Sequence, residues 1–314
     1  MRRPAKISAV VPTLGASPLL AGCLEALRGQ ASAEIEMEIV VVDQGACPLA
    51  LSAGVADRVL RLERNLGFAG GTNVGLRLST GELVATVNDD LLVEPGWARE
   101  LAAALAAHPG AAAAQGVNLL LERPALADGC GLAWNRSWQA VQVGHGLPAP
   151  PADGPAREVF GVSATAALFR RAALDAVALP SGGAFDERLG SYYEDVDLAC
   201  RLRAAGFTAL SVPAARARHA GSATGRAGLG VGRQRMIYGN RYLVAARLLG
   251  SGFWPRLPRL VVRDWKDLAI ALAHGEAGAA AGIAAGWGHA LVRLPGFAWR
   301  GGPAVPLTEI ARFR

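Results

Sequence analysis

The sequence predicts an α/β fold, a doubly wound and mostly parallel sheet with helices on both faces, followed by a helical C-terminal extension. Two observations carry this prediction. Short apolar runs alternate with segments of helical periodicity through the first hundred residues, and such alternation implies right-handed crossovers between parallel strands. A chain of 314 residues also has room for one large or two modest domains.

The predicted elements follow one another regularly up to residue 108. Buried-type strands are expected at 7–12, 38–42, 58–62 and 83–87. Helices are expected at 18–28 and from Pro95 to His108, and a further short helix could end at 75–79. The stretch from 122 to 155 has no sustained period and predicts a long loop or a small insertion. Later elements are a strand at 159–169, helices at 171–178 and 194–205, and a strand at 208–212.

Beyond His219 the sequence predicts a Gly-rich linker, two helices at 234–249 and 257–273, and an Ala/Gly-rich tail. We therefore expect a sheet domain over residues 1–225, with halves 1–121 and 122–225, and a helical extension over 226–314. Charge divides along similar lines: residues 1–198 hold 15 Lys and Arg against 22 Asp and Glu, and residues 199–314 hold 17 against 4. The basic part is either an ordinary solvated surface or attracts a diphosphate or an anionic membrane.

Composition excludes several classes of protein. The hydrophobic share of 52% includes much alanine, and the best candidate for a membrane span, 268–292, is interrupted by His274, Glu276 and His289. Four scattered cysteines lack metal-ligand spacing, and the short apolar run at the N-terminus does not predict secretion. Aromatic residues are too few and too separate from the arginines for a nucleic-acid platform. We expect a cytoplasmic protein, soluble or peripheral at the membrane.

Acidic residues follow two of the predicted strands. Asp43 ends the second, and Asn88, Asp89 and Asp90 end the fourth. Ligands of open parallel sheets bind at the carboxyl ends of strands. Asp43 alone is as consistent with a turn, but adjacent Asp89 and Asp90 repel each other, which favours a divalent cation that bridges to a nucleotide diphosphate.

A second acidic group begins the helix at 194–205. Glu194, Asp195 and Asp197 crowd its first turn, where the helix dipole tolerates negative charge. The spacing fits plain helix-start chemistry and equally a general base that faces the crevice. His219 follows the last predicted strand and, taken alone, is more often structural than a ligand. The Gly-rich segment 65–75 fits neither a P-loop nor a dinucleotide fingerprint.

Six segments in this order resemble the family-2 inverting glycosyltransferases of the GT-A fold, most closely a rhamnosyltransferase-like branch. They are AVVPT (9–13), EIVVVDQG (38–45), RNLGFAGGTNVGL (64–76), NDD (88–90), AFDERLGSYYEDVDLACRLRAAGF (184–207) and RARH (216–219). The sequence departs from the family at Asn88, where Asp is usual, and at Gln44, where Asn or Ser is common. The resemblance implies that 1–121 binds a nucleotide sugar and that 122–225 carries the catalytic and acceptor side.

The resemblance also implies roles for individual residues. Asp90 and His219 would hold Mg²⁺ or Mn²⁺, Asp195 would be the general base, and Glu194 would orient it or contact the acceptor. The donor would meet a group made up of Pro12, Thr13, Asp43, Asn65, Gly67 and Asp89.

The substrates implied are dTDP-rhamnose or a UDP-sugar as donor and a glycan or polyprenyl-linked acceptor, in cell-surface polysaccharide synthesis. Two rival readings are a sugar nucleotidyltransferase and a non-catalytic nucleotide-sugar-binding subunit. The first would need a Gly-rich basic loop after strand one, where the chain has Pro12, Thr13, Leu14 and Gly15. The second would lack the acidic pair or the base, which are present. The C-terminal helices could lie on a membrane, pair two subunits or cap the domain.

Overall fold

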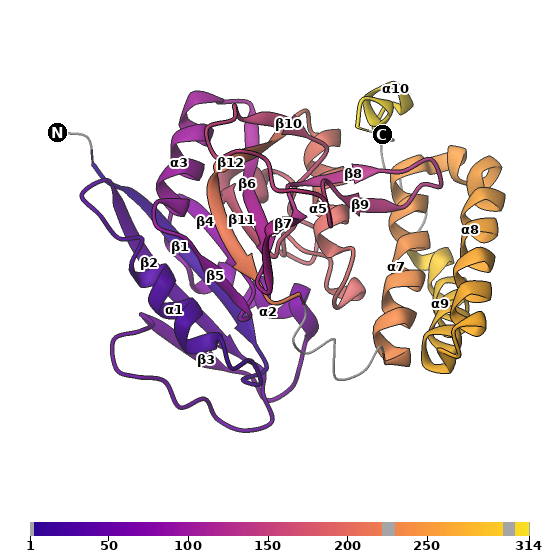
Figure 1. Cartoon of the computed structure of the whole chain (residues 1–314), viewed down its shortest axis with the longest axis horizontal. Coiled ribbons are helices and arrows are strands. Elements are labelled where there is room, and N and C mark those ends of the chain that lie inside the picture. Colours follow the sequence, from indigo (N-terminus) through magenta and orange to yellow (C-terminus); the bar gives the residue numbers. More distant parts are fainter. Residues whose placement is uncertain (1–2, 222–229, 298–304, 314) are drawn as a thin grey trace.

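The computed structural model describes residues 3–221, 230–297 and 305–313, and Figure 1 shows a sheet flanked by helices with a separate group of helices beside it. The first part of the chain forms β1 (Ala5–Thr13), α1 (Leu20–Arg28), β2 (Ile35–Asp43), β3 (Arg58–Arg61), α2 (Gly67–Leu78), β4 (Leu83–Val87), β5 (Leu91–Val93), α3 (Trp97–Ala107) and β6 (Ala111–Leu120). The second part forms β7 (Arg123–Gly129), β8 (Leu132–Trp134), β9 (Ala140–Gln142), β10 (Arg157–Val159), β11 (Ala166–Arg170), α4 (Arg171–Ala176), η1 (Glu187–Leu189), α5 (Glu194–Ala204) and β12 (Thr208–His219).

The large sheet has the strand order β10-β12-β6-β11-β4-β1-β2-β3. Strands β1 to β4 are mutually parallel. β11 is antiparallel to both of its neighbours, so β6 returns to the direction of β4, and β12 follows it in parallel. Six of the eight strands on this path therefore run the same way, as the sequence predicts, and β1, β2, β4, β6 and β12 all end at one edge.

Two apolar layers cover the faces of this sheet. Along β1, Ile7, Ala9 and Val11 pack against α1 and α3 on one face of the sheet. Val10 packs on the opposite face, in the apolar cluster that includes residues of α2, α4 and α5. This alternation follows from the period of two residues along a strand. Because both faces are covered, β4 is buried along its whole length, and β1 and β2 contain the buried apolar runs 9–12 and 39–42.

Two sequence expectations for the sheet need correction. The strand expected at 159–169 is broken into β10 and β11, because 160–165 leaves the ladder and crosses towards α5. At Gly161 a side-chain Cβ would lie 2.3 Å from the Cβ of Ala199. The sequence also predicts no element between His108 and Leu121, where the buried strand β6 lies. Its alanine run has no period that distinguishes strand from helix.

The C-terminal part forms α7 (Val231–Leu249), η2 (Gly250–Gly252), α8 (Phe253–Ala273), α9 (Ala277–Phe297) and α10 (Leu307–Ala311). The first two long helices confirm the prediction, but the expected Ala/Gly-rich tail is largely the helix α9. Its small residues allow close packing on α7: a Cβ at Gly286 would lie 2.7 Å from the Cβ of Tyr238.

The C-terminal helices share an apolar core with residues 132–196 of the sheet domain rather than standing apart. Side chains of α7, α8 and α9 form one apolar cluster with Trp134, Phe160, Leu189 and Val196. The expected boundary at 225/226 and most of the Gly-rich linker lie outside the described residues. Of the helices described, none is long and apolar enough to cross a membrane.

Candidate active site

One pocket of about 600 Å³ lies at the carboxyl edge of the sheet, between the ends of β4, β6 and β12 and the start of α5. Its lining includes five of the residues that the sequence singles out: Asp89, Asp90, Glu194, Asp195 and His219. Asp89 and Asp90 at the end of β4 therefore line the same pocket as Glu194 and Asp195 of α5. The lining also includes Asp128 on β7 and Arg233 on α7.

His219 lies between two carboxylates. Its Nε2 is 3.1 Å from Asp90 Oδ1, and its Nδ1 is 2.8 Å from Asp128 Oδ2. The β12–β5 pairing sets His219 opposite Leu91, one residue after Asp90, which explains how the two side chains meet. Burial lowers the pKa of His219, but the hydrogen bonds to the two carboxylates outweigh it and raise the pKa to about 9.

This arrangement fits a divalent cation. Two ligands of an octahedral Mg²⁺ lie about 3 Å apart when each is about 2.1 Å from the metal, close to the separation of Asp90 Oδ1 and His219 Nε2. Asp128 on the other ring nitrogen is the carboxylate that typically orients a metal-binding histidine. Among the described residues no cluster of three His, Cys, Asp or Glu side chains forms a metal site. The pair therefore suits a metal that takes further ligands from water and phosphate.

Asp89 connects this edge to the donor group expected from the sequence. Thr13 Oγ1 donates a hydrogen bond to Asp89 Oδ2, and Ser17 Oγ donates to the Asp89 carbonyl at 3.0 Å. Burial raises the pKa of Asp89, against the lowering effect of Thr13. Thr13 pairs in register with Asp43, and Pro12 precedes it as a buried residue. The ends of β1, β2 and β4 thus adjoin one another.

The rest of the donor group does not line the pocket of 600 Å³. Asp43 is 2% exposed, and its carboxylate accepts hydrogen bonds from Arg61 Nη1 at 2.7 Å and from Gly45 N at 2.9 Å. Asn65 is exposed and caps the amide of Gly67 at 2.7 Å. Gly67 has φ of +74°, and a Cβ there would lie 2.7 Å from the Gly190 carbonyl oxygen, so glycine is required.

Asp195 and Asp197 occupy different environments although both begin α5. Asp195 is half-buried, lines the pocket and accepts hydrogen bonds from Val196 N at 2.8 Å and Ala164 N at 3.3 Å. Asp197 is fully buried and pairs with Arg201 and Arg247. Asp195 therefore lines the pocket, whereas Asp197 is held in buried ion pairs away from it.

Glu194 lies beside Asp195 and is 7% exposed. Burial raises the pKa of both carboxyls, and the charge of Asp195 raises that of Glu194 further. Glu194 Oε2 is buried without a hydrogen-bond partner among the described atoms. Such an acceptor is costly to leave unpaired, so it is available for a hydroxyl group that enters the pocket.

A strained loop leads into these acids and is held by α7. Tyr192 and Tyr193 both have positive φ, 68° and 71°, which is unfavourable for side chains with a Cβ. Asn240 is fully buried, and its Nδ2 donates to the carbonyl oxygens of Leu189, Ser191 and Tyr192 at 2.8–3.1 Å. The C-terminal extension therefore fixes the backbone immediately before Glu194.

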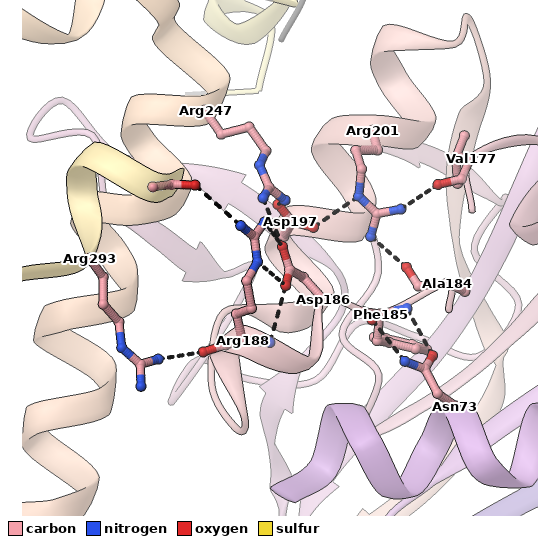
Figure 2. Close-up of polar contacts among 11 residues, drawn as sticks. Asn73, Val177, Ala184, Phe185, Asp186, Arg188, Asp197, Arg201, Arg247 and Arg293 are labelled. Carbon is pink, nitrogen blue, oxygen red and sulfur yellow. Dashed lines mark hydrogen bonds and ion pairs between the residues drawn. The ribbon is translucent and has the colours of Figure 1, made fainter. Parts of the chain in front are cut away.

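Figure 2 shows a second connection, between α7 and the segment 186–201, formed by ion pairs around the buried residues Asp186 and Asp197. Arg247 on α7 contacts Asp197 on α5 and Asp186 before η1, the latter at 2.7 Å. Arg188 also pairs with Asp186, at 2.6 Å. Burial raises the pKa of Asp186, but Arg188 and Arg247 outweigh it and lower the pKa to about 2. These contacts join the helices to the segment that carries the acids.

Sequence reasoning missed four residues of the site: Gln44, Asp128, Arg233 and Asn240. Gln44, noted only as a departure, accepts from Leu66 N at 2.8 Å and donates to the Gly67 carbonyl at 3.2 Å. Asp128 lies in the unpatterned stretch after residue 121, and a lone Asp before Gly carries no signal there. Arg233 and Asn240 belong to a helix whose relation to the pocket depends on tertiary packing.

Comparison with known proteins gives one family match. Residues 8–120 match the model described as glycosyl transferase family 2. The uncharacterized protein y4gI of Sinorhizobium fredii (strain NBRC 101917 / NGR234) is 26% identical over 240 residues, which are 69% of this chain and 25% of that protein. This chain therefore spans about a quarter of the length of that relative.

Solved structures share the fold. GalNAc-T7 with UDP, GalNAc and Mn²⁺ matches with a TM-score of 0.60 at 15% identity, over 80% of this chain and 49% of that one. The mannosyltransferase PcManGT from Pyrobaculum calidifontis, with GDP-Man and Mn²⁺, matches with a TM-score of 0.53 at 19% identity, over 94% of this chain and 88% of that one. Residues 1–349 of S. aureus TarS, in complex with UDP-GlcNAc, match with a TM-score of 0.51 at 20% identity, over 76% of this chain and 66% of that one. At these identities the likeness concerns the fold, and it confirms the GT-A architecture predicted from the sequence.

Proposed function

We propose that this chain, whose residues 8–120 match the model of glycosyl transferase family 2, transfers a sugar from a nucleoside diphosphate to an acceptor hydroxyl, with inversion at the anomeric carbon. The observation that carries the proposal is a single pocket that holds both the Asp90–His219 pair and the Glu194–Asp195 pair. The first pair fits a cation bound to a diphosphate, and the second fits a hydroxyl that must lose a proton.

Asp195 is the group proposed as general base. The amides of Val196 and Ala164 hold its carboxylate in place, and burial beside Glu194 raises its pKa, which makes it a better proton acceptor. In the proposed reaction Asp195 takes the proton of the acceptor hydroxyl as that oxygen bonds to the anomeric carbon and the sugar–diphosphate bond breaks. Glu194 would accept a hydrogen bond from the acceptor at its unpaired Oε2.

Asp90 and His219 would hold Mg²⁺ or Mn²⁺, and the cation would offset the negative charge that develops on the leaving diphosphate. Asp128 keeps a proton on His219 Nδ1, so that Nε2 offers its lone pair to the cation. Asp89, fixed by Thr13, would contact the ribose or sugar of the donor. Pro12, Asp43, Asn65 and Gly67 would support the nucleotide at the ends of β1 and β2 and the start of α2.

We also propose the finer assignments that the resemblance implies. They are a donor of the dTDP-rhamnose or UDP-sugar type, a glycan or polyprenyl-linked acceptor in cell-surface polysaccharide synthesis, and a cytoplasmic location at the inner face of the membrane. The donor residues come from segments before residue 121 and the base from α5, which supports a donor half at 1–121, an acceptor half at 122–225 and an extension at 226–314.

The test is binding and turnover across dTDP-, UDP- and GDP-sugars with Mn²⁺, Mg²⁺ or EDTA. We expect one donor to raise the melting temperature only with metal. D195N should lower turnover about 10²- to 10⁴-fold and leave that thermal shift intact, whereas D153N, a change at an exposed carboxylate outside the pocket, should alter neither. Absence of donor binding with any metal would refute the donor site. Binding without turnover of glycan or lipid-linked acceptors would instead support a non-catalytic subunit.

A further inference from the structure

The outward face of α8 carries large apolar side chains. Its inward side is defined by the buried residues Phe253, Leu260, Asp264 and Ala271. At 100° per residue, a row of apolar residues runs along one flank of the opposite side, made up of Trp254, Pro258, Val262, Trp265, Ala269 and Leu272, all exposed. Trp254, Val262, Trp265 and Leu272 are between 55% and 62% exposed. A soluble helix normally turns such a row towards a core.

A basic row lies beside the apolar one on the same outward half. It consists of the exposed residues Arg259, Arg263 and Lys266. Of the two acids of α8, Asp264 is fully buried, and Asp267 is half-buried, accepts a hydrogen bond from Tyr238 at 3.0 Å and pairs with Arg263 at 2.9 Å. The outward half of α8 is therefore both apolar and positively charged.

The apolar row continues onto α9. Leu291 and Val292 are 74% and 82% exposed. A largely apolar recess of about 590 Å³ lies between the two helices, where Trp254 of α8 meets Leu291, Leu294 and Pro295 of α9. The exposed apolar surface thus extends over two helices that pack against each other, which is more than scattered surface side chains provide.

We propose that this face of α8 and α9 binds the surface of a membrane that contains anionic phospholipids. Trp254, Trp265 and Val262 would enter the boundary between headgroups and acyl chains, and Arg259, Arg263 and Lys266 would contact lipid phosphates. An amphipathic helix with tryptophan on its apolar side and basic residues on its polar side has the composition of an interfacial helix. The inference goes beyond sugar transfer and does not depend on it.

A second copy of this chain is the main competing occupant. An isologous contact would bring the three basic side chains of α8 against the same row of the other copy, where Asp267 is half-buried and already pairs with Arg263, and enclosing like charges is costly. Lipid phosphates supply the opposite charge, at about 1 kcal/mol for each Lys or Arg near the surface. Charge complementarity therefore favours the membrane.

The test is cosedimentation with vesicles of phosphatidylethanolamine and phosphatidylglycerol, compared with pure phosphatidylcholine. The charge variant is R259Q/R263Q/K266Q, and the apolar variant is W254Q/W265Q. The matched control is R77Q/R99Q/R157Q, which removes the same charge from exposed positions on α2, α3 and β10. Circular dichroism and the donor-induced thermal shift report separately on folding and on the sugar-nucleotide site.

We expect the parent and the control to bind the anionic vesicles alike and to leave them as salt rises. The charge variant should bind on the order of 100-fold more weakly, since three residues at about 1 kcal/mol each are lost, and the apolar variant should also lose binding while keeping its donor response. A parent that ignores anionic vesicles, or a charge variant that sediments as well as the control, overturns the proposal. A dimer that the apolar variant abolishes would point to the second copy instead.

Discussion

The two acidic groups of the pocket are built in different ways. Asp89 and Asp90 lie between β4 and β5, and His219 ends β12, so the pairing of β5 with β12 brings them together. Glu194 and Asp195 begin a helix whose approach is set by α7, through the hydrogen bonds of Asn240 and the ion pairs of Arg247. The strand-end group depends on the sheet, whereas the base depends on residues about 50 positions further along the chain. The C-terminal helices therefore help to form the pocket that holds the proposed base.

The largest effect on stability is expected from a substitution of Arg247. R247M leaves Asp197 and Asp186, which are 0% and 2% exposed, with one arginine partner each. Removing one member of a buried ion pair costs about 3–5 kcal/mol, and we expect a loss in the lower part of that range in urea unfolding. R293Q is the control, because Arg293 only donates to the Arg188 carbonyl at the rim, and it should cost less than about 0.5 kcal/mol. Equal losses would contradict the role given to the ion cluster.

His219 of the strand-end group and Asp186, the ion-pair partner of Arg247, should stabilise the fold in opposite pH ranges. The pKa of His219 rises from 6.5 to about 9 in the fold, so its stabilisation is complete below pH 6.5 and is lost as pH rises through 9, about 3 kcal/mol in all without metal. The pKa of Asp186 falls from 3.8 to about 2, so its stabilisation is present above pH 3.8 and is lost as pH falls towards 2, about 2 kcal/mol.

Urea unfolding in EDTA across this pH range measures both effects. H219Q should flatten only the alkaline side and D186N only the acidic side. Added Mn²⁺ should reduce the alkaline loss in the parent, because a metal binds the deprotonated imidazole. An alkaline loss that H219Q leaves unchanged would show that the two carboxylates do not hold the proton on His219.

Asn240 tests whether α7 positions the base. N240A removes the donor from three carbonyls in the loop before Glu194, and we expect a stability loss of about 2 kcal/mol. Because the loop is strained at Tyr192 and Tyr193, it should relax and displace Asp195, lowering kcat about 10- to 100-fold. Donor affinity should change little. Y238F, which removes a polar group from the same helix at its contact with Asp267, should leave kcat unchanged, and a matching fall there would argue for a general loss of packing.

The sequence predicts the strand-end group well and the base group only in part. Asp43, Asp89 and Asp90 directly follow predicted strands, so the sequence places them at one edge of the sheet. His219 meets Asp90 through the pairing of β12 with β5, which the sequence does not predict. Both Asp195 and Asp197 sit in one helical turn, and which of them faces the pocket depends on where Arg201 and Arg247 lie. Partners so distant in sequence leave no local pattern.

The missed elements have similar causes. The alanine run of β6 and the Ala/Gly-rich α9 are buried by close packing, and small residues carry little periodic signal even though they permit that packing. The segment 160–165 is apolar enough for a strand, but its amides serve Gln115 and Asp195 instead of a ladder. Hydrogen bonds to side chains, rather than low strand propensity, break the strand there.

Asp128 gives the smallest and sharpest test, because it is the one part of the strand-end group that the sequence does not predict. D128N keeps the size of the side chain but removes the charge that faces His219 Nδ1. Loss of such an orienting carboxylate lowers metal affinity about 10- to 100-fold, and we expect about tenfold, because Asp90 and His219 both remain. Titration of the donor-free protein with Mn²⁺, followed by the electron paramagnetic resonance signal of free Mn²⁺, measures this directly.

The pKa of His219 should fall in D128N as well, because one of the two carboxylates that raise it is neutralised. Proton NMR of the imidazole in EDTA reads this change independently of any metal. D153N is again the matched control and should alter neither quantity. If D128N lowered the pKa of His219 but left Mn²⁺ affinity at the parent level, Asp128 would be an electrostatic neighbour of the histidine, and the orientation of Nε2 towards a cation would have to come from β12 alone.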